Sequence, residues 1–97
     1  MPSWSERSPL AVQTGLSIAA PSTGLTLPSG AKVRGALVQV FAAPIRYWVD
    51  GTAPTATTGH RADVYDQIEL ETFAEANNFR AIRESGVSAT LEVTFYG

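Results

Sequence analysis

Apolar and polar residues alternate most clearly at the C-terminal end of the chain. Apolar positions from Val87 to Phe95 alternate with polar positions from Ser88 to Tyr96. Successive side chains of a β-strand point to opposite faces, so this pattern predicts a half-buried strand whose apolar face meets a core. The segment 67–71 repeats the pattern, and we expect Ile68 and Leu70 to face inward.

The central segment 33–50 predicts two more strands, separated at 42–44 because Pro44 cannot donate to a strand ladder. One face of the first strand is small and aliphatic, with Ala36, Val38, Val40 and Ala42. Its other face carries Leu37, Gln39 and Phe41. On the second strand, one face carries Ile45, Tyr47 and Val49, and the other carries Arg46, Trp48 and Asp50. Both faces of each strand carry large apolar groups, so both are internal to a two-layer structure or one is an exposed patch.

The N-terminal third predicts short strands at 15–19 and 24–27, separated and ended by turns rich in Pro, Ser and Gly. Residues 1–9 have no periodicity and include Pro2 and Pro9, which predicts an extended arm. We expect Trp4, alone in this arm, to dock on its own domain or on a neighbour.

One short helix is predicted after the segment 67–71. Thr72 and Glu75 have the spacing of a capping box, in which each side chain accepts from a backbone N–H of the first turn. Asn77 and Asn78 would end the helix in the left-handed conformation, and 79–83 would resume as a strand. The fold class is therefore all-β: a small antiparallel β-sandwich or barrel (10–97) with one short connecting helix and an extended N-terminal arm (1–9).

Length and charge restrict the functions to be considered. The 97 residues are enough for one domain, and the charged fraction of 16% is low against a typical ~25%, which favours a surface partly covered by a partner. The net charge of −2 is unevenly distributed, with a basic excess in 1–60 and an acidic excess in 61–97, a split that favours head-to-tail contact between copies. The basic residues are isolated, which argues against nucleic-acid binding.

The chain has no cysteine, so disulfides and thiolate metal sites are excluded. No signal peptide and no apolar run of about 20 residues is found. We therefore expect a protein that is made in the cytoplasm and does not enter a membrane.

His60 is the only histidine and the first candidate for catalysis, paired with Asp63 or Asp66. A serine nucleophile would also be needed, and the Gly-x-Ser-x-Gly elbow is absent. Asp63, Asp66, Glu69 and Glu71 are the densest carboxylate group, but their spacing does not match an EF-hand loop, and a solvated sheet edge explains them more simply. We predict no enzyme activity, no cofactor and no metal.

Two loop features have structural and functional interpretations. Asp50-Gly51 is a strong signal for a tight type I′ hairpin turn. The small, neutral segment 52–59 that follows is interpreted as a surface loop, with an adaptable contact loop as the alternative.

The candidate interface consists of large apolar side chains that strand alternation turns away from the expected core, together with the tryptophan of the arm. Aromatic anchors of this kind are enriched at protein interfaces. The residues are Trp4, Leu37, Phe41 and Trp48.

The segment 45–55 resembles the Tyr-x-x-Asp-Gly-Thr-x-Pro-Thr hairpin of immunoglobulin-like modules in bacterial glycosidases and surface proteins. Taken with Thr58-Gly59-His60, 79–83 and 88–96, it is similar to small all-β accessory proteins of tailed bacteriophages, of the capsid cement or decoration kind or tail-associated. The similarity spans about residues 33–97 and rests on turn and strand chemistry.

The phage resemblance implies a virion structural protein that is made in the host cytoplasm, binds the major capsid protein, associates with itself as a homo-oligomer and stabilises the assembled head. Two alternatives remain open: a tail- or baseplate-associated virion protein, and a carbohydrate-binding immunoglobulin-like module. The second would need aligned exposed aromatics, and Tyr47 and Trp48 are adjacent in sequence and so face opposite ways on a strand.

Overall fold

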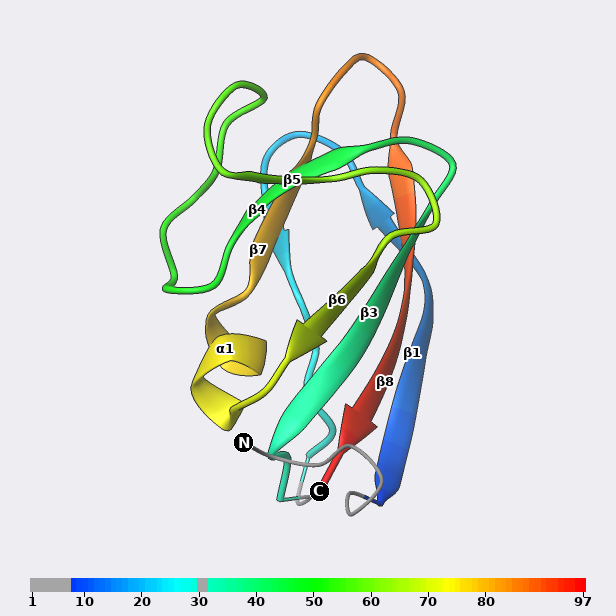
Figure 1. The fold of residues 1–97 in the computed structure, drawn as a ribbon, viewed down its shortest axis with the longest axis vertical. Helices are drawn as coiled ribbons and strands as arrows, with labels where there is room; N and C mark the ends of the chain where they lie inside the picture. Colours follow the sequence, from blue (N-terminus) through cyan, green and yellow to red (C-terminus); the bar gives the residue numbers. More distant parts are fainter. Residues whose placement is uncertain (1–7, 30–31) are drawn as a thin grey trace.

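The chain folds into two four-stranded antiparallel sheets packed face to face, in a computed structural model that describes residues 8–29 and 32–97 (Figure 1). Sheet A contains, in spatial order, β1 (Pro9–Ile18), β8 (Ala89–Tyr96), β3 (Gly35–Phe41) and β6 (Gln67–Leu70). Sheet B contains β2 (Thr23–Gly24), β7 (Arg80–Arg83), β4 (Ile45–Trp48) and β5 (His60–Ala62). The helix α1 (Phe73–Asn78) joins β6 to β7 and packs against β3 and β6. The predicted all-β sandwich with one short helix is confirmed.

The strand order is that of a jelly roll, because the chain passes repeatedly between the sheets and each sheet interleaves early with late strands. Its first strand pairs with its last over almost the full length of β1. An immunoglobulin sandwich instead places its first two strands side by side. The immunoglobulin-like part of the sequence resemblance is therefore wrong at the level of topology, although β4 and β5 do form the expected antiparallel hairpin.

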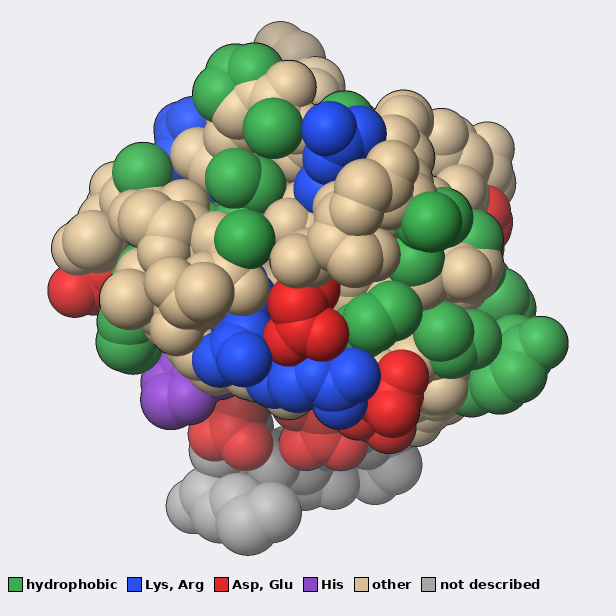
Figure 2. Space-filling model, turned by 90° about the horizontal axis from the view of Figure 1, so that it is seen from above, with side chains coloured by type: hydrophobic (Ala, Val, Ile, Leu, Met, Phe, Trp, Pro, Cys, Tyr) green, Lys and Arg blue, Asp and Glu red, His purple; other side chains and the backbone are tan. Residues whose placement is uncertain are grey.

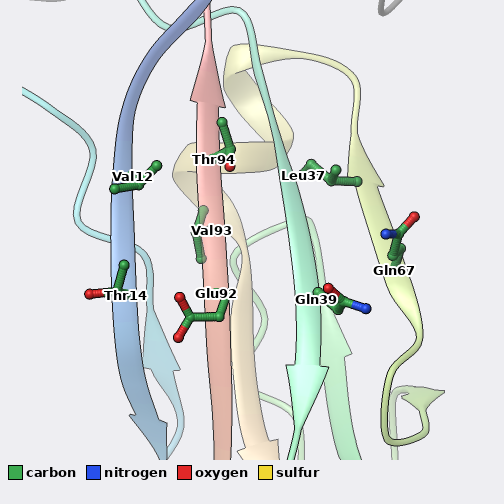
Figure 3. A pocket seen from close by; sticks show the side chains of 8 residues that line it. All are labelled: Val12, Thr14, Leu37, Gln39, Gln67, Glu92, Val93 and Thr94. Carbon is green, nitrogen blue, oxygen red and sulfur yellow. The ribbon is translucent and has the colours of Figure 1, made fainter.

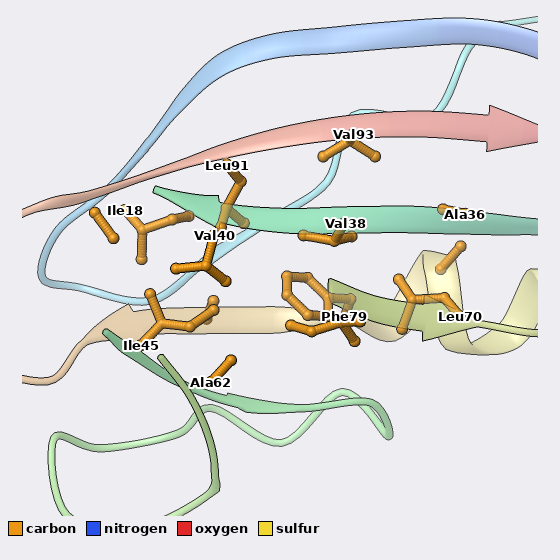
Figure 4. Packing of buried hydrophobic residues seen from close by; sticks show 14 of the residues in the cluster. Ile18, Ala36, Val38, Val40, Ile45, Ala62, Leu70, Phe79, Leu91 and Val93 are labelled. Atoms are coloured by element: carbon orange, nitrogen blue, oxygen red, sulfur yellow. The ribbon is translucent and has the colours of Figure 1, made fainter. Parts of the chain in front are cut away.

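The core lies between the two sheets and contains the inward residues that strand alternation predicts, Ile68 and Leu70 among them. Leu70 is shown with its neighbours in Figure 4. Every second residue of β8, from Ala89 to Phe95, is buried. Val87 was expected to belong to this series, but it lies 59% exposed in the β7–β8 loop. The largest fully buried side chains are Phe79, Phe95, Ile18, Ile45, Leu70, Leu91, Val38, Val40 and Val93.

The predicted break at 42–44 is a corner where the chain leaves sheet A and enters sheet B. Ala42 has φ +76°, and the Ala43 N–H donates to the Phe41 carbonyl at 2.9 Å, which closes a γ-turn. Ala42 is exposed in this turn and Ala43 is buried, so the expected place of Ala42 on the inner face of β3 is wrong. The corner puts β3 and β4 in different sheets, and their outward side chains point in opposite directions.

Strand β1 is longer than the predicted segment 15–19 because a bulge conceals its periodicity. Ala11 and Gln13 are the less exposed positions before the bulge, whereas Leu16 and Ile18 are the less exposed positions after it. Gly15, with φ +63°, marks the shift in register between the two halves. Pro9 already pairs with Tyr96, so the sheet begins inside the range predicted as an arm, while Trp4 and the other residues of 1–7 lie outside the described residues.

The helix begins at the predicted cap and ends differently from the prediction. The Thr72 hydroxyl accepts from the Glu75 N–H at 3.1 Å, and the Glu75 carboxylate accepts from the Glu71 N–H at 2.7 Å. Asn78 is the last helical residue, and Phe79 follows in an extended conformation with φ −61° and ψ 130°. Neither asparagine is left-handed, because the side chain of Phe79 enters the core directly and the chain must turn extended to place it there.

Candidate functional site

The outer face of sheet A carries mainly neutral side chains in rows that cross the strands. In one row Val12, Thr94, Leu37 and Glu69 are neighbours in register. In the next row Glu92, Gln39 and Gln67 are neighbours. The only charged residues in these rows are the two glutamates, and no arginine or lysine belongs to either row.

The two rows enclose a shallow depression of about 150 Å³ on the outer face of the sheet (Figure 3). Its volume is well below the 300–1,000 Å³ of usual small-molecule sites, so it fits one ring or one side chain and not a whole cofactor. Val12, at its rim, is 66% exposed. The lining residues are Val12, Thr14, Leu37, Gln39, Gln67, Glu92, Val93 and Thr94.

Glu92 is the only charged residue that lines this depression. Its Oε2 accepts from the Gly15 N–H at 2.9 Å, so the bulge of β1 holds the carboxylate in place. None of the ion pairs among the described residues involves Glu92. The side chain is therefore positioned by the fold and keeps a second oxygen for another donor.

An aromatic pair lies at one end of the same face. The rings of Phe41 and Tyr65 meet edge to face, with centroids 5.7 Å apart, and Tyr65 is 68% exposed. Tyr65 has φ +72° in the turn 63–66, which the Asp66 N–H closes by donating to the Asp63 carbonyl at 3.1 Å. The Gln39 amide also donates to the Tyr65 carbonyl at 3.3 Å, so the pair is tied to the rows.

Trp48 lies away from this face, on the outer side of sheet B. It follows Tyr47, whose ring packs inward against Phe79 with centroids 5.6 Å apart. Trp48 contacts His60 with ring centroids 5.2 Å apart, and Tyr47 lies 5.5 Å from the same imidazole. Burial raises the pKa of the Tyr47 hydroxyl, and the negative charge of Asp66 adds to the effect.

His60 packs against these two rings, and within the described residues it forms no hydrogen bond or ion pair with Asp63 or Asp66, the carboxylates that a catalytic role would pair with it. Asp63 instead accepts from its own neighbour Val64 and from Arg61. The imidazole therefore completes an aromatic cluster at the end of the β4–β5 hairpin and is not aligned as a general base by a carboxylate.

Arginines and acidic side chains interleave at the end of the molecule shown in Figure 2. Glu84, which follows β7, accepts from Arg46 Nε at 2.8 Å and from Arg61 Nε at 2.9 Å. The Arg61 and Arg46 donors lower the pKa of Glu84, and its carboxylate raises that of Arg61. Arg46 also donates to the Gly59 carbonyl at 3.2 Å. These bonds join β4, β5 and the β7–β8 loop, which is a structural role.

Arg80 on sheet B and the threonines of the β4–β5 loop are also bonded within the molecule. Arg80 donates to the Ser22 hydroxyl at 3.0 Å and to the Ser22 carbonyl at 2.9 Å. In the loop 49–59, the Thr55 and Thr58 hydroxyls are 2.7 Å apart, and Pro54 is buried. The internal bonding of this loop agrees with the surface-loop interpretation.

The predicted tight turn at Asp50-Gly51 is not type I′, because only Gly51 has positive φ. The Asp50 carboxylate accepts instead from the Thr52 N–H at 3.0 Å, which lowers the pKa of Asp50. The hairpin of β4 and β5 therefore has a long loop between its strands.

The acidic group at 63–71 divides among a turn, the strand position of Glu69, and Glu71, which follows β6. The Asp66 carboxylate accepts from the Asp63 N–H at 2.8 Å, while Glu69 is exposed on the outer side of β6. The Asp63 carboxylate accepts from Val64, and this bond together with the charge of Arg61 lowers its pKa. In the described part of the chain, no three side chains of His, Cys, Asp or Glu gather closely enough to hold a metal ion.

The structure brings two of the predicted interface residues together and separates the third. Leu37 and Phe41 share the outer face of sheet A, Trp48 lies on the outer side of sheet B, and Trp4 is outside the described residues. Sequence reasoning missed Val12 because the bulge interrupts its strand, and Glu92 because a single outward glutamate is ordinary. Val12 and Glu92 lie close together because of the register between neighbouring strands, and that register has no local signal in the sequence.

Comparison of the chain with protein-family models, with characterised proteins and with solved structures finds no match. Within 8–29 and 32–97, no helix is long and apolar enough to cross a membrane. Any assignment of function therefore rests on the fold and on the surfaces described above.

Proposed function

We propose that this protein is a non-enzymatic virion structural protein, a capsid cement or decoration subunit that binds the assembled phage head and the major capsid protein. In this proposal the outer face of sheet A is the contact surface, and copies of the chain associate as a homo-oligomer. The single observation that carries the proposal is the group of partly exposed apolar side chains on this face, which has few charges.

The outer face of sheet A combines large apolar side chains with few charges, which supports a contact role. The outward residues of β3 are Leu37, Gln39 and Phe41, and each is only half-buried by its own molecule. Val12 and Tyr65 extend the apolar surface at either side. Large apolar and aromatic side chains with few charges are typical of the central part of protein interfaces.

The strand order offers fold-level support. Jelly rolls occur in viral capsid proteins and in lectins, two classes that bind through the surfaces of a rigid β body. Fold alone does not assign function, so this support is an analogy. A cement subunit acts by mass action, because it binds the assembled shell and not its separated subunits and so stabilises the shell.

Quantitative mass spectrometry of particles purified from the source lysate tests the proposal. We expect hundreds of copies of this chain per particle, scaled to the major capsid protein. A dozen copies would move the protein to the tail or baseplate, the alternative virion location. Absence from purified particles would overturn the virion proposal.

Carbohydrate binding is the second candidate, and the lectin occurrences of the jelly roll are the observation that favours it. Tyr47 packs inward and Trp48 outward, so these two rings cannot form one sugar platform. The exposed ring of Tyr65 beside Phe41 is the remaining aromatic surface. Glycan-dependent quenching of tryptophan fluorescence would report a site at Trp48, and chemical shifts at Tyr65 would report one on sheet A.

A further inference from the structure

We propose that the depression on sheet A binds an arginine side chain of the protein to which this domain attaches, with Glu92 as the anionic partner of the guanidinium group. This inference rests on the proposed contact role of the face and names the chemistry that the face recognises. It is carried by the shape, the charge and the bonding of the depression.

The walls of the depression suit an aliphatic stem. Val12 on β1 and Leu37 on β3 stand on either side of Thr94 in the same row (Figure 3). Arginine buries its three methylene groups along apolar surface of this kind while its charged end reaches a polar partner. The volume of about 150 Å³ accommodates a single side chain.

The carboxylate of the polar row suits a group that only donates. Glu92 is the charged acceptor among the lining residues and lies beside the side-chain amides of Gln39 and Gln67. Guanidinium has five N–H donors in a fixed plane and no acceptor, and it pairs with carboxylate more strongly than a neutral group does. Because Gly15 N–H fixes one Glu92 oxygen, the carboxylate is already oriented before a ligand arrives.

The charge of the surroundings agrees with a cationic occupant. Glu92 has no ion-pair partner within 8–29 and 32–97, although Arg46, Arg61 and Arg80 of sheet B are bonded to Glu84 and Ser22. A carboxylate held among neutral side chains attracts a cation and repels polyanions. None of the side chains that line the depression is aromatic, which makes it a poor platform for a sugar ring.

The test is an NMR titration of the ¹⁵N-labelled domain with arginine capped as its N-acetyl methylamide, compared with the equally capped citrulline, the neutral isostere of arginine. We expect arginine to shift the amides of Val12, Leu37 and Thr94, and citrulline to bind at least tenfold more weakly. Glu92→Gln keeps an oxygen for Gly15 and removes the charge, so it should weaken arginine binding about tenfold or more.

Glu69→Gln is the matched control, because Glu69 lies on the same outer face but does not line the depression. It should leave the titration unchanged. Three results would each overturn the proposal: equal binding of capped arginine and capped citrulline, no shift up to the solubility limit of capped arginine, or binding that does not change with Glu92→Gln.

Two other occupants are distinguished by further measurements. Binding of a neutral oligosaccharide, cellohexaose as the probe, at the same amides with Glu92→Gln unaffected would assign the depression to glycans and overturn the arginine proposal. Sedimentation in which Glu92→Gln abolishes self-association but leaves particle attachment intact would assign the arginine to a second copy, contrary to the proposal. The titration uses no particles, so its failure is separate from failure of the virion role.

Discussion

The outer faces of the two sheets differ in where their polar groups find partners. On sheet B the side chains of Arg46, Arg61 and Arg80 are bonded to Glu84 and Ser22 of the same molecule. On sheet A the Glu92 carboxylate meets only a backbone N–H of its own chain, beside half-buried aliphatic groups. Polar groups that satisfy one another stabilise the domain, whereas positioned groups with unused capacity are available to a partner. Under the proposed function, the bonded arginines of sheet B contribute to stability and the outer face of sheet A is the contact surface.

The largest expected effect is in the core that both sheets share. Phe79 is fully buried and packs against Tyr47, so Phe79→Ala should lower the free energy of unfolding by about 3–5 kcal/mol. Urea unfolding followed by tryptophan fluorescence measures this loss. A loss below about 1 kcal/mol would mean that the sheets do not share one packed core.

Replacing Gly59 and Gly15 by alanine compares how much an added Cβ destabilises the backbone next to sheet B and in sheet A. Gly59 has φ +122°, and an added Cβ would lie 3.1 Å from the Tyr47 carbonyl oxygen, whereas Gly15 has φ +63° and open space around it. We expect Gly59→Ala to cost about 2–3 kcal/mol and Gly15→Ala about 1 kcal/mol in the same urea experiment. The reverse order would contradict the crowding described at the start of β5.

The ion pairs of Glu84 predict a dependence of stability on pH. Arg61 and Arg46 hold the pKa of Glu84 below its ordinary value. The ionised Glu84 therefore stabilises the fold fully at a pH above the ordinary pKa of a glutamate, and this stabilisation is lost as the pH falls through the lowered pKa. Glu84→Gln should lower the melting temperature at pH 7 and reduce the further loss below about pH 4. Glu92→Gln, the same chemical change on sheet A, should alter the melting temperature less. Equal effects would remove the distinction between the sheets.

The smallest expected effect on stability is at Leu37. Its side chain lies on the outer face of sheet A and is half-buried only by neighbouring strands, so Leu37→Thr should change the free energy of unfolding by about 1 kcal/mol or less. Threonine is β-branched, a shape that suits a strand. A cost near that of Phe79→Ala would make Leu37 a core residue and exclude it from a contact surface.

The sequence was sufficient for the parts of the fold that depend on local patterns. The alternation at 88–96, the break at Pro44 and the cap at Thr72 all lie where they were predicted. The first half of β1 was missed because the bulge at Gly15 reverses which positions face inward, and period-two reasoning then sees no strand. The order of the strands depends on long-range pairing, which local patterns do not contain.

The candidate surface was predictable only in part, for a related reason. Alternation correctly turned Leu37, Phe41 and Trp48 away from the core. It did not reveal that the corner at Ala42 sends β3 and β4 to different sheets, so that Trp48 and Phe41 face opposite ways. The depression at Glu92 arises from four strands distant in the sequence and from one bulge.

The most direct test of the contact role of sheet A compares two exposed valines. Val12 lies on the outer face of sheet A and is 66% exposed, and Val87 lies in the β7–β8 loop and is 59% exposed. Each is changed to glutamate, and attachment to purified particles grown without the gene is measured by quantitative mass spectrometry. The account predicts that Val12→Glu loses attachment while Val87→Glu retains it, with both variants folded by circular dichroism. Attachment retained by Val12→Glu and lost by Val87→Glu would contradict it.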